Sequence, residues 1–143
     1  MFDKLKFTSL FIASALVAIP AIAHNVEISN EVAATFHITP NHNPQAGKEA
    51  LAWFALTRRG GQTIPLSECR CNLNVYAVPR AAEARPILQP ELTAINVEKY
   101  QQIPGAEIVF PNAGAYELEI SGTAKDDSSF SPFELTYTVN VRP

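Results

Sequence analysis

The chain has 143 residues, of which 47% are hydrophobic and 17% are charged, and its formal net charge is −3. This length suits one domain with a core of its own, and the composition excludes a disordered tail or a coiled coil. The acidic balance and the lack of a basic cluster argue against a nucleic-acid partner, because the phosphate backbone would repel the protein. We therefore expect a single small globular domain.

The amino-terminal segment predicts a secretory signal peptide. Two lysines precede an apolar run from Phe7 to Ile19, and small residues then stand at the −3 and −1 positions before a cut after Ala23. The apolar run is too short to span a bilayer comfortably, and an uncleaved anchor is the alternative. We expect a signal peptide over residues 1–23 and a mature domain over residues 24–143. The mature domain would lie in the periplasm or outside the cell, without membrane insertion.

The elements that follow are predicted to be strands, because apolar and polar residues alternate with a period of two. In chain order, the alternating stretches are residues 34–39, 69–78, 115–120 and 133–142, while residues 50–56 are apolar on both faces. Residues 79–105 hold prolines that should break any long element and leave a short strand near Leu92–Val97. No helix is expected after the signal peptide.

About seven short strands in a chain of this length favour an all-β, antiparallel two-sheet sandwich. Within it, the motif Gly114-Ala115-Tyr116-Glu117-Leu118 follows a turn and opens a strand. This motif resembles the tyrosine corner of immunoglobulin-like domains, in which the ring packs into the core and the hydroxyl holds a loop. The resemblance implies an immunoglobulin-like sandwich with Tyr116 in its core, and we expect Trp53 to be a centre of the same core.

The candidate metal ligands are the three histidines His24, His37 and His42. Cleavage after Ala23 would make His24 the first residue, so that its amine and its ring could chelate one metal ion together. Copper(II) prefers such nitrogen ligands in tetragonal geometry, and a strand over residues 25–30 that turns back would bring His24 toward His37. The alternative is a frayed terminus with two surface histidines. The only methionine, Met1, leaves with the signal peptide, which excludes a methionine-rich copper(I) site.

The run from Gly47 to Pro65, which reads G-K-x₄-W-x-x-L-x₃-G-G and ends in Ile-Pro, resembles the small periplasmic YtkA-like and CopC-like domains. Copper handling is the usual function suggested for these families, and CopC-like proteins use a mature N-terminal histidine, a feature that His24 matches. Those families take a partner histidine from far along the chain, whereas no histidine follows His42 here. The resemblance implies copper as a cofactor.

Cys69 and Cys71 lie two residues apart, so both side chains should face the apolar side of one strand. An oxidising compartment favours a disulfide between them, although the Cα separation in an extended strand is near the upper limit for a disulfide. The alternatives are two buried thiols, a copper(I) dithiolate, thiol–disulfide exchange or an interchain bridge.

The sequence lacks the common catalytic motifs and any phosphate-binding loop. Glu117 and Glu119 share one strand face, where we expect them to be solvated rather than to act as an acid–base pair. Two functions remain. The first is a monomeric, noncatalytic immunoglobulin-like module that binds an envelope or extracellular protein partner through loops or an edge strand. The second is a periplasmic copper-binding or delivery protein built around His24, with a copper-dependent oxidative activity as a more remote form of it.

Overall fold

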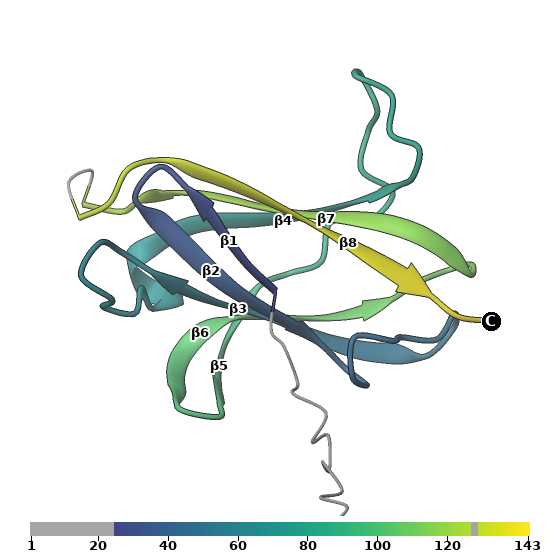
Figure 1. Cartoon of the computed structure of the whole chain (residues 1–143), viewed down its shortest axis with the longest axis horizontal. Helices are drawn as coiled ribbons and strands as arrows, with labels where there is room; N and C mark the ends of the chain where they lie inside the picture. Colours follow the sequence, from purple (N-terminus) through teal and green to yellow (C-terminus); the bar gives the residue numbers. More distant parts are fainter. Residues whose placement is uncertain (1–24, 127–128) are drawn as a thin grey trace, which may run out of the picture.

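The computed structural model describes residues 25–126 and 129–143, which fold as two antiparallel β-sheets (Figure 1). The strands are β1 (Asn25–Ser29), β2 (Val32–Ile38), β3 (Glu49–Thr57), β4 (Cys69–Ala77), β5 (Thr93–Val97), β6 (Tyr100–Val109), β7 (Gly114–Ala124) and β8 (Phe133–Val141). A short 3₁₀ helix, η1 (Leu66–Glu68), precedes β4. One sheet has the order β1-β2-β3-β6-β5 and the other the order β4-β7-β8. The prediction of an all-β protein with two antiparallel sheets is confirmed.

The core lies between the two sheets and is built from alternate residues of each strand. In β2, every second residue from Val32 to Ile38 is buried, and the residues between them face away from the core. Phe36 stacks on Phe54 of β3 and on Tyr137 of β8, with ring centroids 5.2 Å and 4.6 Å apart. The Tyr137 hydroxyl donates a hydrogen bond to the Ala34 carbonyl at 3.0 Å. Burial raises the pKa of Tyr137 well above its usual range, so this donor keeps its proton.

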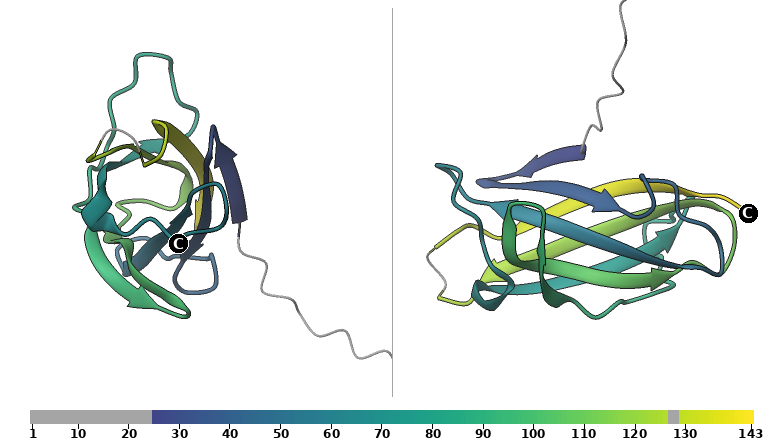
Figure 2. Two further views of the ribbon diagram at one scale, coloured as in Figure 1. Left: turned by 90° about the vertical axis from the view of Figure 1, so that its left-hand side faces the viewer. Right: turned by 90° about the horizontal axis from the view of Figure 1, so that it is seen from below.

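The margins of the sandwich differ from each other. At one margin β1 lies beside β8 (Figure 2), where the Ser29 hydroxyl accepts a hydrogen bond from the Glu134 N–H at 3.3 Å. At the other margin the chain leaves β4, projects away from the sheets and returns to β5 (Figure 1). Over the residues described, no helix has the length and apolar character needed to cross a membrane.

The prediction that prolines would break the segment before residue 105 is wrong for β6. This strand runs through Pro104, which pairs with Ala94 of β5. Its pairing with β3 ends at Gly105, one residue short of the proline. The N–H that proline lacks is therefore not needed by β3, which is how an interior proline is tolerated in a strand. With β1 and β6 included, the described residues hold eight strands rather than about seven.

Tyr116 and Trp53 occupy different parts of the molecule. The Tyr116 ring belongs to the main core, and its hydroxyl donates to the Asn112 carbonyl at 2.7 Å and accepts from the Asn112 N–H at 3.3 Å. Trp53 is only 1% exposed, yet it lies on the outer face of its sheet in a smaller cluster with Ala55 and Ile103. The second cluster forms because β3 is apolar on both faces, so both faces must be covered.

We expect Tyr116→Phe to lower the free energy of unfolding by about 1 kcal/mol, because it removes a bridging hydroxyl and leaves backbone groups of Asn112 without their partner. Urea denaturation of the purified domain measures this. Tyr100→Phe is the control, because it also removes one tyrosine hydroxyl but at a residue that packs against the smaller cluster on the outer face of the sheet. Equal stability of the Tyr116→Phe variant and the wild type would contradict the assigned role.

Candidate metal site

The structure brings together two of the three candidate metal ligands. The rings of His37 and His42 meet edge to face, with centroids 4.5 Å apart and planes at 75°. His37 lies on the outer face of β2, whereas its neighbour in sequence, Phe36, faces the core. His42 lies in the turn after β2, and its N–H donates to the Ile38 carbonyl at 2.8 Å, so the turn folds back over the end of the strand. His24 lies outside the described residues.

The local sequence explains why the turn closes in this way. Asn41 and His42 both adopt left-handed backbone conformations, with φ of 47° and 57°. Asparagine tolerates this conformation better than most residues and is common in turns. The consecutive left-handed residues reverse the chain, and the His42 side chain returns to the edge of β2.

Aromatic rings fix the orientation of the two imidazoles. His37 pairs with Trp53 across the β2–β3 ladder and stacks on its indole, with centroids 5.3 Å apart and planes at 23°. The His42 ring also meets the ring of Phe36 edge to face, with centroids 5.8 Å apart. The Nδ1 atom of His37 and the Nε2 atom of His42 are both shielded from solvent. The two histidines are therefore half-buried members of one cluster of aromatic rings.

The amino-terminal end of β1 lies beside this cluster. Asn25, the first described residue, pairs with Phe36, which precedes His37. Within residues 25–126 and 129–143, no group of three or more His, Cys, Asp or Glu side chains could hold a metal ion. The described residues thus supply two imidazoles as candidate metal ligands, next to the start of β1.

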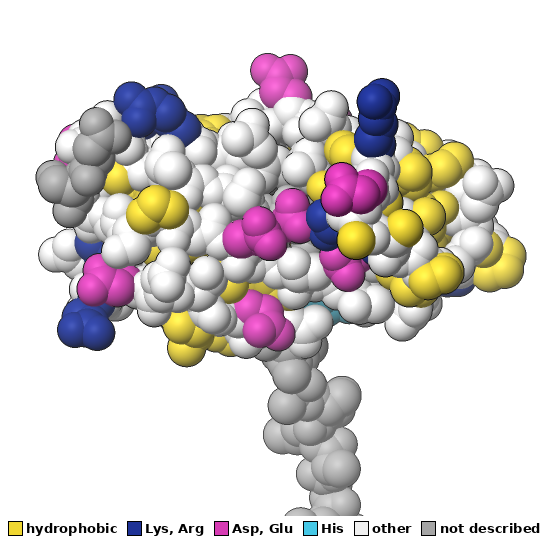
Figure 3. Space-filling view, turned by 90° about the horizontal axis from the view of Figure 1, so that it is seen from above, with side chains coloured by type: hydrophobic (Ala, Val, Ile, Leu, Met, Phe, Trp, Pro, Cys, Tyr) yellow, Lys and Arg dark blue, Asp and Glu magenta, His cyan; other side chains and the backbone are white. Residues whose placement is uncertain are grey.

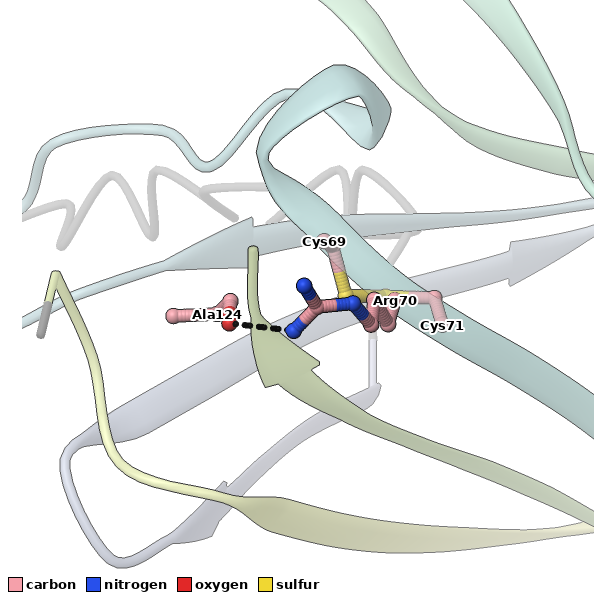
Figure 4. The surroundings of a disulfide bond; sticks show 4 residues. All are labelled: Cys69, Arg70, Cys71 and Ala124. Atoms are coloured by element: carbon pink, nitrogen blue, oxygen red, sulfur yellow. Dashed lines mark hydrogen bonds between the residues drawn. A yellow bond between two sulfur atoms is a disulfide. The ribbon is translucent and has the colours of Figure 1, made fainter. Parts of the chain in front are cut away.

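Cys69 and Cys71 form a disulfide within β4, with their Cα atoms 5.2 Å apart (Figure 4). Arg70 lies between them and donates a hydrogen bond from Nη1 to the Ala124 carbonyl at 3.2 Å. Gly122 of β7 leaves room for both sulfurs, because a Cβ there would lie 2.7 Å from one Sγ and 3.0 Å from the other. With the disulfide formed, a copper(I) dithiolate at this pair would require prior reduction.

The expectation that Glu117 and Glu119 are simply solvated is wrong for Glu119, whereas Glu117 stays partly exposed. Glu119 is 7% exposed, and Arg80 donates to the carboxylates of both glutamates at 2.7 Å. The same guanidinium lies 3.4 Å from the ring centroid of Tyr76, and its pKa is raised, chiefly by the hydrogen bond to Glu119. Arg80 comes from the projecting segment, so these contacts attach that segment to the three-stranded sheet. Acidic side chains extend across the middle of the face over this sheet (Figure 3).

The pairing of His37 with His42 and the stack of His37 on Trp53 are features that sequence analysis missed. The stack could have been found by aligning the two strands as a hairpin, whereas the histidine contact depends on turn geometry. Comparison of the chain with protein families, with curated proteins and with solved structures gives no match.

We expect Gly122→Ala to lower the free energy of unfolding of the oxidised protein by about 1–3 kcal/mol, because the added methyl group overlaps both sulfurs. Urea denaturation with and without reductant measures the effect, and the penalty should shrink once the sulfurs can separate. Ser121→Ala, at the preceding position, serves as the control. A Gly122→Ala variant as stable as the wild type would show that the sulfurs are not packed against β7 as described.

Proposed function

We propose that this protein binds copper(II) outside the cytoplasm, through His37, His42 and the amino terminus that cleavage after Ala23 would create at His24. The observation that supports this best is the 4.5 Å contact between the His37 and His42 rings beside the start of β1. Its role would be binding or delivery of the metal, without catalysis.

The proposed donor set suits copper(II). An amino-terminal histidine offers its amine and its ring, and His37 and His42 add two further imidazole nitrogens. Nitrogen donors in a tetragonal arrangement are what copper(II) prefers. Protons compete with the metal ion for the amine and imidazole nitrogens, so binding should weaken as the pH falls.

Strand register supports the proposed third ligand. Asn25 pairs with Phe36, Val26 with Thr35 and so on along the antiparallel ladder. One further step of this register toward the amino terminus would set residue 24 opposite His37. Besides cleavage after Ala23, the proposal needs the continuation by one pair of a ladder that already has five pairs.

We also propose that the sandwich is immunoglobulin-like. Strands β2-β3-β6-β5 and β4-β7-β8 follow the order that immunoglobulin domains give to A-B-E-D and C-F-G. In this correspondence Tyr116 opens strand F and holds the preceding corner, as a tyrosine corner does. Two departures from antibody domains are the disulfide, which lies within β4, and Trp53, which packs on the outer face of β3.

A second candidate function is a module that binds an envelope or extracellular protein. The observation in its favour is β1, an edge strand on which Val26 and Ile28 are 57% and 72% exposed. Apolar side chains on an open strand edge are typical of surfaces that pair with another chain.

We expect one molar equivalent of copper(II) to quench the fluorescence of the mature protein strongly. Trp53 is the only tryptophan, and its indole stacks on His37, so a paramagnetic ion bound to that ring would lie close to the fluorophore. Zinc(II) is the control, because it is bound by imidazole but quenches little. The electron paramagnetic resonance spectrum should show a tetragonal nitrogen-ligated centre. Quenching that survives in a His37→Ala, His42→Ala double variant would contradict the proposed site.

We expect the free amino terminus to be required. Protein that begins at a free His24 should bind copper(II) more than about tenfold more tightly than the same protein with an acetylated terminus, because acetylation converts the amine nitrogen into an amide that no longer serves as a ligand. Isothermal titration measures the affinities, and intact-mass analysis of the exported protein identifies its first residue. Asn25→Ala is the control with an unchanged terminus. Equal affinity of the blocked and free forms would refute a terminal ligand.

A further inference from the structure

The disulfide between Cys69 and Cys71 lines a cavity of about 570 Å³. Leu66, Leu92 and Lys125 belong to the same wall as the two cysteines. Cys69 is 3% exposed, whereas Cys71 is half-buried and is therefore the more accessible of the two. A small molecule that enters the cavity can thus reach the disulfide at Cys71. Cysteines that are fully enclosed in a core lack such access and are inert.

The disulfide adds little restraint to the chain. Only Arg70 lies between the two cysteines (Figure 4), and a disulfide that closes so short a loop removes less entropy from the unfolded chain than a long-range one. Other interactions hold β4, because each of its nine residues pairs with a residue of β7. Arg70 also donates hydrogen bonds to the Ala124 and Lys125 carbonyls, both at 3.2 Å. Breaking the S–S bond should therefore leave β4 in place.

The surroundings leave room for the two thiols that reduction produces. Two sulfur atoms that are no longer bonded need a larger separation than two bonded ones. On the side of β7, position 122 is a glycine, and any Cβ there would lie within 3.0 Å of both sulfurs. On the other side, the cavity gives Cys71 space to move. Because β4 keeps the two Cα atoms 5.2 Å apart, the thiols remain neighbours and can form the bond again.

The lining of the cavity suits a small polar thiol. Its amide and hydroxyl side chains come from Asn72, Asn74, Gln89 and Ser121. Glu91 and Lys125 add one charge of each sign, which complements the ammonium and carboxylate groups of a molecule derived from cysteine. A cation beside the sulfur also favours the thiolate, which is the form that attacks a disulfide. The volume falls within the range of cavities that hold small-molecule ligands.

We propose that Cys69 and Cys71 form an exchangeable disulfide that oxidises small thiols derived from cysteine. A thiolate of the small molecule attacks the Sγ atom of Cys71, so that a mixed disulfide forms and the bond to Cys69 breaks. The electron pair of the broken bond stays on the Sγ atom of Cys69, which takes up a proton. A second small thiolate attacks the small-molecule sulfur of the mixed disulfide and displaces Cys71, which is protonated in turn.

The net reaction converts one protein disulfide and two small thiols into one protein dithiol and one small disulfide. The same steps in reverse form the protein disulfide again and consume the small disulfide. The exchange does not depend on the copper proposal, because it concerns β4 in the three-stranded sheet, whereas the histidine pair lies at β2 in the other sheet. One proposal can therefore fail while the other stands.

The first test measures how fast reduced glutathione opens the disulfide in the folded mature domain and in the same domain unfolded by urea. Quenching with iodoacetamide and intact-mass analysis give both rates. The folded protein should react at no less than about one tenth of the unfolded rate, because Cys71 is accessible from the cavity. A lower folded rate would show that the disulfide is closed to small thiols and would overturn the proposal.

The same quenched samples identify the sulfur that is attacked. Tandem mass spectrometry should find glutathione chiefly on Cys71 and the alkyl group chiefly on Cys69. Glutathione divided equally between the two cysteines, or found chiefly on Cys69, would contradict the assigned attack. The fully reduced domain should keep its far-UV circular dichroism, since the β7 ladder holds β4. Loss of the strand signal on reduction would show that the disulfide is needed for the fold and would overturn the proposal.

The last test examines the charge in the cavity. Lys125→Gln should slow the reaction with glutathione at least about threefold at low ionic strength, because it removes the cation that favours the attacking thiolate. Lys48→Gln is the matched control, since it makes the same change of net charge at an exposed residue outside the cavity, and it should react like the wild type. Equal rates for all three proteins would overturn the proposed approach through the cavity.

Discussion

The pairing of β2 with β1 on one side and β3 on the other is the constraint on which both the core and the candidate metal site depend. The same register that sets Phe36 beside Phe54 also sets His37 beside Trp53. A shift by one residue would turn every side chain to the opposite face, placing imidazole in the core and phenyl outside. The buried stack of Phe36 between Phe54 and Tyr137 opposes any such shift. Core packing on the inner face of β2 thus fixes the position of His37 on the outer face.

Much of the sandwich could be predicted from alternation alone. The inward residues of β2 and β8 and the turn before Tyr116 follow directly from the sequence pattern, because one buried face imposes a period of two. Strand β6 could not be predicted in this way, since Pro104 and Gly105 interrupt its pattern and only its neighbours show which main-chain groups are needed. The burial of Glu119 depends on Arg80, which is 39 residues away in sequence.

The candidate metal site was likewise predicted from the sequence only in part. The sequence identified His37 and His42 as nitrogen donors, but their contact depends on two consecutive left-handed residues after β2. Such a turn depends on the combined geometry of the whole loop. The conformational preferences of single residues therefore do not specify where the His42 side chain lies. Trp53 was expected in the main core because it is large and apolar. Its actual place follows from β3, which is covered on both faces.

The fold keeps ionisable groups out of the space between its two sheets. That space is filled by apolar and aromatic side chains, so ionisable groups lie on the outer faces of the sheets, at strand ends and in turns. The two sheets differ in what they place there. The larger sheet carries the two imidazoles beside the start of β1, and the three-stranded sheet carries the ion pairs of Arg80 with Glu117 and Glu119.

Strand β1 connects the metal proposal to stability. Most of this strand is exposed, and it is held by its ladder to β2 and by a few contacts with β8. An edge strand of this kind is prone to fraying and to pairing with other chains. If the residue before Asn25 shares a metal ion with His37 and His42, the ion joins the end of β1 to β2 and to the following turn. Binding that occurs only in the folded state stabilises that state by mass action. The same ion that the protein carries would then hold its most exposed strand in register.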